Sequence, residues 1–223
     1  MNWKKYWNDH ASKQGGDLIA QVQRKDAKST ELTINHIIRN LNISKIDEVL
    51  DVCCGNGILT EAIAKKCHGI VGVDQSEALL NVAKLKSKQK NSQYILGSAL
   101  ELHSVLEGKS FDKIYLQFSL QYFTKKRGGA RLIKQLLTVL KPGGVIFIGD
   151  ITNKDKLFHF YDTPIKKARF LKQQLQRKNN MGKFWKRSEL ELICTKLGVN
   201  GTYLEQPSEL PYAHYRFDFI ITK

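Results

Sequence analysis

Residues 48–60 read EVLDVCCGNGILT, and this stretch decides which fold the rest of the chain can adopt. Its first five residues form a short, mostly apolar run that predicts a buried strand, and the residues after Gly57 predict a helix. Gly55 and Gly57 lie between them, and glycine lets a backbone approach a ligand and adopt torsion angles that a Cβ would forbid. Because the helix N-terminus presents unpaired N–H groups, this turn predicts the binding site of a cofactor that carries a nucleoside.

The spacing of the glycines indicates which cofactor binds. A dinucleotide site needs G-x-G-x-x-G, and Thr60 occupies the position of the third glycine, so a nicotinamide oxidoreductase is a remote alternative. Asp51 ends the strand in the pattern D-x-C-x-G-x-G. This resembles D/E-x-G-x-G-x-G, the first motif of class I S-adenosylmethionine-dependent methyltransferases, with Cys53 replacing the first glycine. The resemblance implies that Asp51, Cys53, Gly55 and Gly57 bind S-adenosylmethionine, with Asp51 at its charged amino acid end.

A second acidic residue follows the next predicted strand, residues 69–74. Asp74 lies 23 positions after Asp51, and an acid about 20 residues beyond a glycine loop is placed to bind the ribose hydroxyls of a nucleoside. The alternative is that Asp74 caps the helix expected from residue 76, a role that is compatible with ribose binding. We favour ribose binding and include the adjacent Gln75 in the cofactor site.

Two further stretches resemble the same family. Residues 94–96 predict a strand followed by Gly97-Ser98-Ala99, where the family commonly has G-D-A; Ser98 replaces the acid that faces adenine, but the backbone N–H groups of Ser98 and Ala99 remain available. Residues 111–123, FDKIYLQFSLQYF, resemble F-D-x-V-x-x-N-x-x-L-H-H. This implies that Gln117 meets the methionyl part of the cofactor, and that Gln121 and Tyr122 meet the methyl acceptor.

Alternating strands and helices define the expected fold. Helices are predicted from Thr30 as N-cap to about 42, and at 58–66, 76–90, 128–140 and 188–197; LKPGG at 140–144 ends one of them before a strand at 145–150. This order predicts an α/β, doubly wound, mostly parallel sheet, and the resemblance implies seven strands, as in the Rossmann-like methyltransferase fold, with helices on both faces. Polar residues at the predicted strand ends converge on one crevice: Asp51, Asp74, Ser98, Gln117 and Asp150.

We expect one methyltransferase domain over 1–223, with two appended regions. Residues 1–44 are an N-terminal helical lid region, in which Tyr6 or Trp7 would either cover the cofactor or simply pack on the domain. Residues 151–187 are a basic helical insertion, or cap, whose part 154–187 holds eleven Lys or Arg against two Asp. With its aromatics, including Tyr161, the cap would either bind an anionic acceptor or present a solvated charged face.

The C-terminal part predicts two strands joined by a loop at 206–214, which the family places at the rim of the active site. Its PYAHYRFD sequence, together with GDITN at 149–153, resembles bacterial methyltransferases associated with surface carbohydrates, and it brings Arg216 to the acceptor. A hydroxyl acceptor must lose a proton, and His214, His159 and Asp150 are the candidate bases. The alternatives are two ordinary surface histidines and an aspartate that holds its loop.

Composition narrows the class of protein. The net charge of +15 favours a small anionic acceptor or, as an alternative, RNA or tRNA; against RNA, we find neither a separate RNA-binding module nor an N-P-P-Y-type motif. Cys53 and Ser98 depart from the family pattern, which leaves a non-catalytic binding protein of this fold as a further alternative. The four cysteines lack a C-x-x-C pair and predict neither a disulfide nor a metal site. No long apolar run or signal peptide is evident, so we expect a soluble, cytoplasmic protein.

Overall fold

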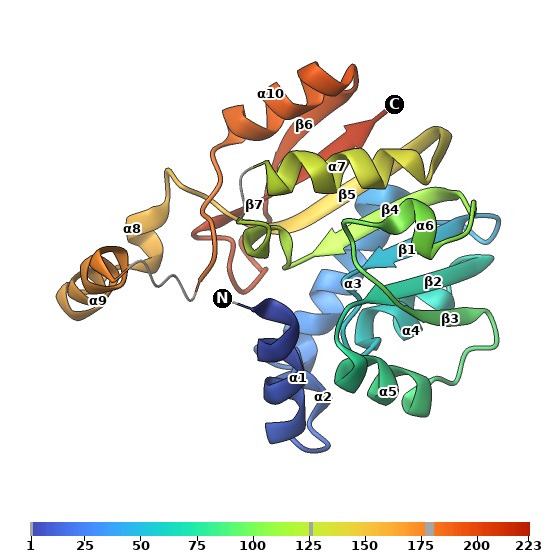
Figure 1. The fold of residues 1–223 in the computed structure, drawn as a ribbon, viewed down its shortest axis with the longest axis horizontal. Helices are drawn as coiled ribbons and strands as arrows, with labels where there is room; N and C mark the ends of the chain where they lie inside the picture. Colours follow the sequence, from blue (N-terminus) through green and yellow to red (C-terminus); the bar gives the residue numbers. More distant parts are fainter. Residues whose placement is uncertain (1, 125–126, 177–180) are drawn as a thin grey trace.

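The computed structural model describes residues 2–124, 127–176 and 181–223 and contains a seven-stranded sheet (Figure 1). The strand order is β3-β2-β1-β4-β5-β7-β6, in which β1 to β5 run parallel and β7 is antiparallel to both β5 and β6. The predicted doubly wound, mostly parallel sheet is therefore confirmed. The strands are β1 Glu48–Val52, β2 Gly69–Asp74, β3 Ser92–Leu96, β4 Phe111–Gln117, β5 Leu140–Thr152, β6 Asn200–Glu205 and β7 Arg216–Thr222.

Helices fill the connections between these strands and precede the first of them. They are α1 Trp3–Lys13, α2 Leu18–Gln21, α3 Ala27–Leu41, α4 Ile58–Ala64, α5 Glu77–Lys86, α6 Leu102–Val105, the 3₁₀ turn η1 Leu120–Tyr122, α7 Gly128–Thr138, α8 Leu157–Phe160, α9 Pro164–Leu175 and α10 Arg187–Leu197. In the described ranges, none of these helices combines the length and hydrophobicity that crossing a bilayer requires.

Three predicted boundaries were wrong. The helix expected at 76–90 ends at Lys86, and Ser87 is its C-cap. The helix expected after Thr30 begins at Ala27, because Asp26 is its N-cap and accepts the Ser29 N–H at 2.7 Å in a capping box. The LKPGG stretch lies within β5 rather than before it. Its first residue, Leu140, already pairs with Phe111, whose N–H donates to the Val139 carbonyl at 2.9 Å, so the ladder starts before the glycines.

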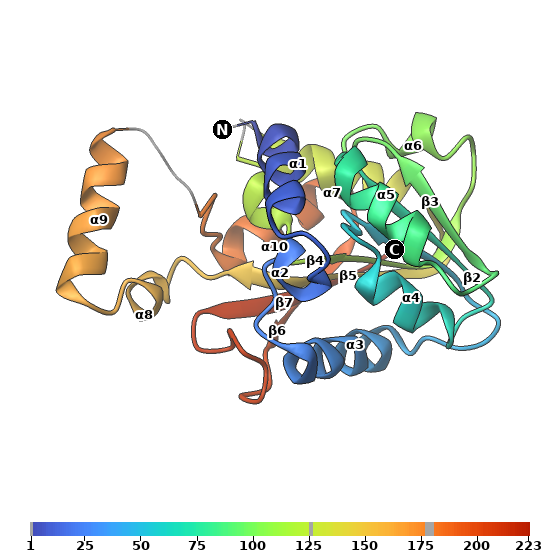
Figure 2. The same ribbon diagram turned by 90° about the horizontal axis from the view of Figure 1, so that it is seen from below.

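Side chains alternate between two hydrophobic layers, one on each face of the sheet. On one face, strand residues such as Leu50 and Leu116 pack with α6, α7 and α10; on the other, Val49 and Tyr115 pack with α3 and α4. Figure 2 shows α3 and α4 on the side of the sheet opposite α7. Because both faces are covered, the ends of the strands are left to form the site.

The N-terminal region and the cap differ in how they attach to the sheet. α1 packs on α5, where Asn8 Oδ1 accepts hydrogen bonds from Ser76 Oγ at 2.8 Å and from the Ala78 N–H at 3.1 Å. α3 covers the sheet through Ile37 and Leu41. By contrast, α8 and α9 project away from the sheet in both views (Figures 1 and 2).

Candidate active site

The loop between β1 and α4 forms a tight turn with three left-handed residues. Cys53, Gly55 and Gly57 have φ values of +62°, +58° and +76°, and the Cys53 N–H donates to the Val73 carbonyl at 2.7 Å. A Cβ at Gly57 would lie 2.6 Å from the hydroxyl oxygen of Tyr94. Cys53 thus adopts the conformation of the glycine it replaces, and the departure from the family pattern leaves the turn intact.

Asp74 supports this turn from the end of β2. Its Oδ2 accepts the Gly55 N–H at 2.9 Å and its Oδ1 accepts the Ser76 N–H at 2.8 Å. Burial raises the pKa of Asp74, while the backbone hydrogen bonds lower it. The alternative that Asp74 is the N-cap of the next helix was wrong, since Ser76 occupies that position and accepts the Leu79 N–H.

Asp51 lies beneath the turn rather than on its surface. Its Oδ2 accepts hydrogen bonds of 2.6 Å from both the Thr60 hydroxyl and the Tyr115 hydroxyl. Burial raises the pKa of Asp51 to about 7, and these two hydrogen bonds oppose the rise. At neutral pH this carboxyl group is therefore poised between its protonated and ionised forms.

Two adjoining cavities open beside the turn and share a wall formed by Trp3, Cys53, Asp74, Gln75, Tyr122 and Phe123. The first extends past Gly55 to Gln117 and Phe118, and the second extends past Gly97 to Ser98 and Ala99. The structure thus brings together most of the residues predicted to bind the cofactor. Asp51, Gly57 and Tyr6 do not line either cavity.

Tryptophan side chains of α1 form the outer wall. The Trp3 and Trp7 rings lie 4.3 Å and 5.8 Å from the Tyr122 ring, centroid to centroid. Tyr6 instead turns toward α2, where its hydroxyl accepts a hydrogen bond from Gln23 Nε2 at 2.7 Å. Sequence analysis overlooked Trp3, although its spacing of four residues from Trp7 places both on one helix face.

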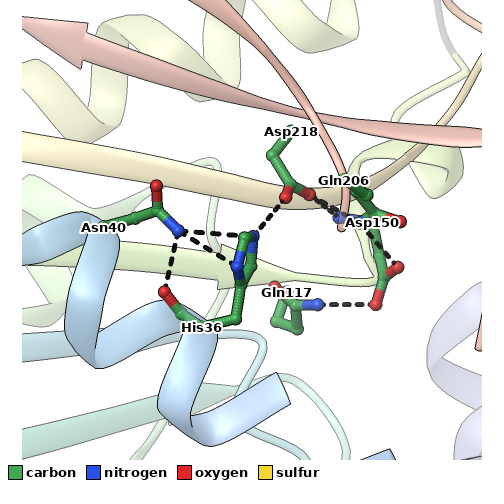
Figure 3. Close-up of polar contacts among 6 residues, drawn as sticks. All are labelled: His36, Asn40, Gln117, Asp150, Gln206 and Asp218. Carbon is green, nitrogen blue, oxygen red and sulfur yellow. Dashed lines mark hydrogen bonds and ion pairs between the residues drawn. The ribbon is translucent and has the colours of Figure 1, made fainter. Parts of the chain in front are cut away.

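Asp150 is the centre of a buried polar network at the end of β5 (Figure 3). It interrupts the β5–β7 register with a φ of +58°. Its Oδ2 accepts from Gln117 Nε2 at 2.5 Å, its Oδ1 accepts from Gln206 Nε2 at 3.1 Å, and its N–H donates to Asp218 Oδ1 at 2.8 Å. Both oxygens of the carboxylate are thus engaged by amides, which supports its predicted alternative role of holding the loop.

The same network extends to α3. His36 Nε2 lies 2.7 Å from Asp218 Oδ2, and Asn40 Nδ2 donates to the His36 carbonyl at 2.8 Å (Figure 3). Gln206 Nε2 also donates to Asp218 Oδ1 at 2.7 Å. His36, Gln206 and Asp218 carry no local sequence signal for the site, because their contacts join segments far apart along the chain.

Two arginines lie near this network, the fully buried Arg216 and the half-buried Arg24. Arg216 is fully buried against the rings of Phe118, Tyr215 and Tyr212, at 4.1, 5.0 and 5.5 Å, and its Nη1 donates to the Asp150 carbonyl. Its Nε and Nη2 have no hydrogen-bond partner among the described residues. Arg216 therefore holds a positive charge with two unused donors.

Arg24 follows α2, and its N–H donates to the Ile19 carbonyl at 3.0 Å. Burial lowers the pKa of its guanidinium group, while the negative charges of Asp150 and Asp51 raise it. Arg24 falls in residues 12–29, for which the sequence shows no clear pattern. Its electrostatic interaction with Asp150 and Asp51 connects it with the site.

The remaining predicted residues lie outside the two cavities. His159 Nδ1 is 3.0 Å from the His214 carbonyl oxygen, both histidines are exposed, and partial burial together with His159 lowers the pKa of His214. Tyr161 packs between Phe160 and Phe170, with ring centroids at 4.8 and 4.6 Å. Their roles in catalysis and acceptor binding stay predictions.

Gln121 is a buried residue of η1. Its Nε2 donates to the Phe118 carbonyl at 2.9 Å, and its own backbone carbonyl accepts the Lys183 N–H at 2.8 Å. Its Oε1 has no partner among the described residues. It joins the turn after β4 to Lys183 in the last part of the cap, and its contact with an acceptor also stays a prediction.

Known proteins resemble this chain in sequence and in fold. A methyltransferase-domain family model matches residues 49–144. The ubiquinone biosynthesis O-methyltransferase of Azoarcus sp. (strain BH72) is 30% identical over 175 residues, which cover 74% of this chain and 72% of that relative. The corresponding enzyme of Acinetobacter baylyi is 33% identical over 137 residues, and the chain spans only 56% of its length.

Among solved structures, the DhpI-SAM-HEP complex matches with a TM-score of 0.65 over 98% of this chain and 94% of that chain. At 15% sequence identity this likeness concerns the fold alone. The family model and the Azoarcus relative indicate the same family as the glycine turn and the strand-end aspartates. The chain belongs to the class I S-adenosylmethionine-dependent methyltransferase family.

Proposed function

We propose that the chain transfers the methyl group of S-adenosylmethionine to a small acceptor. The observation that carries this proposal is the pair of adjoining cavities at the glycine turn, whose shared wall contains Cys53, Asp74 and Gln75. In this proposal the adenine lies toward Ser98 and Ala99, and Asp74 binds the ribose hydroxyls.

Two charged groups outside the cavity walls suit the amino acid part of the cofactor, which carries an ammonium and a carboxylate. Arg24 is a half-buried cation that interacts electrostatically with Asp51, and Asp51 is the carboxyl group beneath the turn. We assign the cofactor carboxylate to Arg24, and Asp51 stabilises the ammonium group through its charge. Pairing the carboxylate with Arg24 and the ammonium with Asp51 would fix the orientation of the cofactor and therefore the direction in which its methyl group points.

The acceptor is proposed to be small and anionic, such as a sugar or related metabolite methylated on oxygen. Phe118 lines the first cavity and its ring lies 4.1 Å from the Arg216 guanidinium, so Arg216 is next to the space beyond the methyl group. The two unused donors of Arg216 match the paired oxygens of a carboxylate or phosphate. A displacement of the Phe118 ring would let such a group reach them.

Methyl transfer from a sulfonium is an in-line displacement, so the protein mainly has to align the acceptor oxygen, the methyl carbon and the sulfur. Positioning of this kind contributes about 7 to 11 kcal/mol in favourable cases. The acceptor hydroxyl loses its proton during the reaction. Asp150 is the candidate base nearest the cavities, and its amide partners would have to give way; His159 and His214 remain the others.

A screen of acceptors with Arg216→Met tests this proposal. We expect labelled methyl transfer to phosphorylated or carboxylated sugars but not to their neutral counterparts. Arg216→Met should raise KM for the anionic acceptor roughly ten- to hundredfold, because a hydrogen bond to a charged group contributes about 1.5 to 3 kcal/mol. Arg216→Lys keeps the charge but not the paired donors, so its KM for the anionic acceptor should lie between those of the parent protein and Arg216→Met.

The cofactor affinity measured by calorimetry separates the possible causes. An unchanged affinity for S-adenosylmethionine in Arg216→Met would show that the fold and the cofactor site are intact. Equal methylation of neutral and anionic acceptors would contradict an anionic acceptor. Failure of the parent protein to bind S-adenosylmethionine would contradict methyl transfer itself.

Cofactor binding should depend on pH through Asp51. Its folded pKa of about 7 lies above the ordinary value of 3.8, so its contribution to stability is greatest at low pH and is lost as pH rises through 7. A cationic ammonium favours the ionised form. We therefore expect the affinity for S-adenosylmethionine to rise roughly five- to tenfold between pH 6 and 7.5, with release of protons on binding.

Calorimetry at pH 7 in buffers with different ionisation enthalpies measures that proton release directly. Asp51→Asn should abolish it, because the amide does not titrate in this range. An unchanged proton release in Asp51→Asn would assign the linkage to another group, for which Asp74 is the nearest acidic candidate.

A further inference from the structure

The α8–α9 arm, residues 157–175, exposes an unusual amount of apolar surface. Eight large hydrophobic side chains are exposed among the described residues, and four of them lie on this arm. Phe158 is 59% exposed, Ile165 74%, Leu171 62% and Leu175 87%. The arm projects from the body in both views (Figures 1 and 2), so this surface is not a by-product of packing at the edge of the sheet.

The apolar residues of α9 form a stripe. Ala168, Leu171 and Leu175 are spaced three and four residues apart, which places them on one face of a helix, and all three are exposed. Phe170 points the other way, toward Tyr161, at 4.6 Å between ring centroids. The arm is thus fixed to its base through one face, and the leucine stripe is free to contact a partner.

Basic residues flank this stripe. α9 contains Lys166, Lys167, Arg169 and Lys172 and no acidic residue. Within the described ranges, Lys166 is paired with Asp162 at 2.8 Å, and Lys167 lies 5.7 Å from the Phe158 ring. A short helix with an apolar stripe between lysines suits the interface of a bilayer, where the stems of the lysines stay in contact with apolar surface and their ammonium groups reach the headgroups.

We infer that the α8–α9 arm docks the protein on a membrane surface rich in anionic phospholipid. RNA would match the charge but not the leucine stripe, and a second copy of the arm would match the stripe but bring like charges together. An anionic bilayer satisfies both features, since each Lys or Arg near such a surface is attracted and each leucine leaves water. Docking through this arm does not require the proposed methyl transfer.

Co-sedimentation with vesicles tests the inference on the full chain. The protein should sediment with vesicles of equal parts phosphatidylcholine and phosphatidylglycerol, but not with phosphatidylcholine alone, and salt should weaken the binding. Leu171→Gln/Leu175→Gln should reduce the partition coefficient roughly tenfold, since two apolar side chains no longer enter the interface. Lys167→Gln/Lys172→Gln should reduce it about fivefold per residue, the factor that corresponds to ~1 kcal/mol per basic residue.

The chain provides a matched control. Ile46 and Leu85 are 84% and 81% exposed and lie outside the arm. Ile46→Gln/Leu85→Gln therefore removes a similar amount of exposed apolar surface from another part of the protein. This control should bind the anionic vesicles like the parent. All these positions are exposed, so none of the variants should change the melting temperature by more than a few degrees.

Three results would overturn membrane docking. The first is absence of binding to the anionic vesicles, or binding that the leucine variant leaves unchanged. The second is a dimer, seen by sedimentation equilibrium without vesicles, that the leucine variant dissociates, which would assign the stripe to a second copy. The third is binding to RNA that the lysine variant weakens and the leucine variant does not, without binding to vesicles.

Discussion

Asp74→Ala is expected to reduce the affinity for S-adenosylmethionine by at least about a hundredfold. Two hydrogen bonds from ribose hydroxyls to a carboxylate contribute about 1.5 to 3 kcal/mol each, and both would be lost. The substitution also removes the acceptor for the Gly55 N–H, at 2.9 Å, so the turn that meets the cofactor loses part of its support. Calorimetric titration with S-adenosylmethionine measures the effect.

Asp47→Ala is the matched control. Asp47 is also a buried aspartate that accepts hydrogen bonds from a neighbouring residue, with Oδ2 at 2.6 Å from the Ser44 nitrogen and 2.8 Å from its hydroxyl. It precedes β1, at the end of the sheet opposite the cavities. Asp47→Ala should lower the stability of the fold and leave the cofactor affinity within about twofold. If the two variants lost the same amount of affinity for S-adenosylmethionine, the role of Asp74 would be limited to supporting the turn.

The framework of the site could be predicted from the sequence because it depends on local patterns. The strands β2 and β4 end in the polar residues Asp74 and Gln117, and Ser98 follows β3. Parallel strands of one sheet bring those ends to one edge. Asp74, Ser98 and Gln117 reach the cavities for this reason. Cys53 fits the glycine motif although it is not a glycine, because the turn requires only a left-handed backbone at that position and Cys53 adopts one.

The second half of the site could not be predicted in this way. Arg24 lies in a segment without periodicity, and its importance depends on the distant carboxylates that surround it. His36 reads in the sequence as one polar residue of an amphipathic helix, yet it contacts Asp218 across 182 positions. Contacts of this kind arise from the path of the whole chain, which local propensity does not encode.

Asp218→Ala is expected to destabilise the fold by about 3 to 5 kcal/mol, because it leaves three buried groups without their hydrogen-bond partner, at about 1 to 3 kcal/mol for each. Asp218 is fully buried on β7 and accepts from Gln206 at 2.7 Å and from the Asp150 N–H at 2.8 Å, besides its contact with His36 at 2.7 Å. The left-handed conformation of Asp150 would lose its main-chain anchor. Denaturation in urea measures the free energy of unfolding.

Asp112→Ala provides the comparison at the opposite end of the sheet. Asp112 binds the Lys141 ammonium at 2.7 Å and, like Asp218, accepts a backbone N–H, that of Glu48 at 2.9 Å. It is partly exposed, so its loss should cost only about 1 kcal/mol. If Asp218 orients Asp150 for catalysis, Asp218→Ala should also lower kcat for methyl transfer while S-adenosylmethionine affinity is retained. A loss of stability with an unchanged kcat would restrict the His36–Asp218 pair to holding β7 against α3. A fall in both kcat and stability, absent in Asp112→Ala, would extend the active site to the buried network behind Asp150.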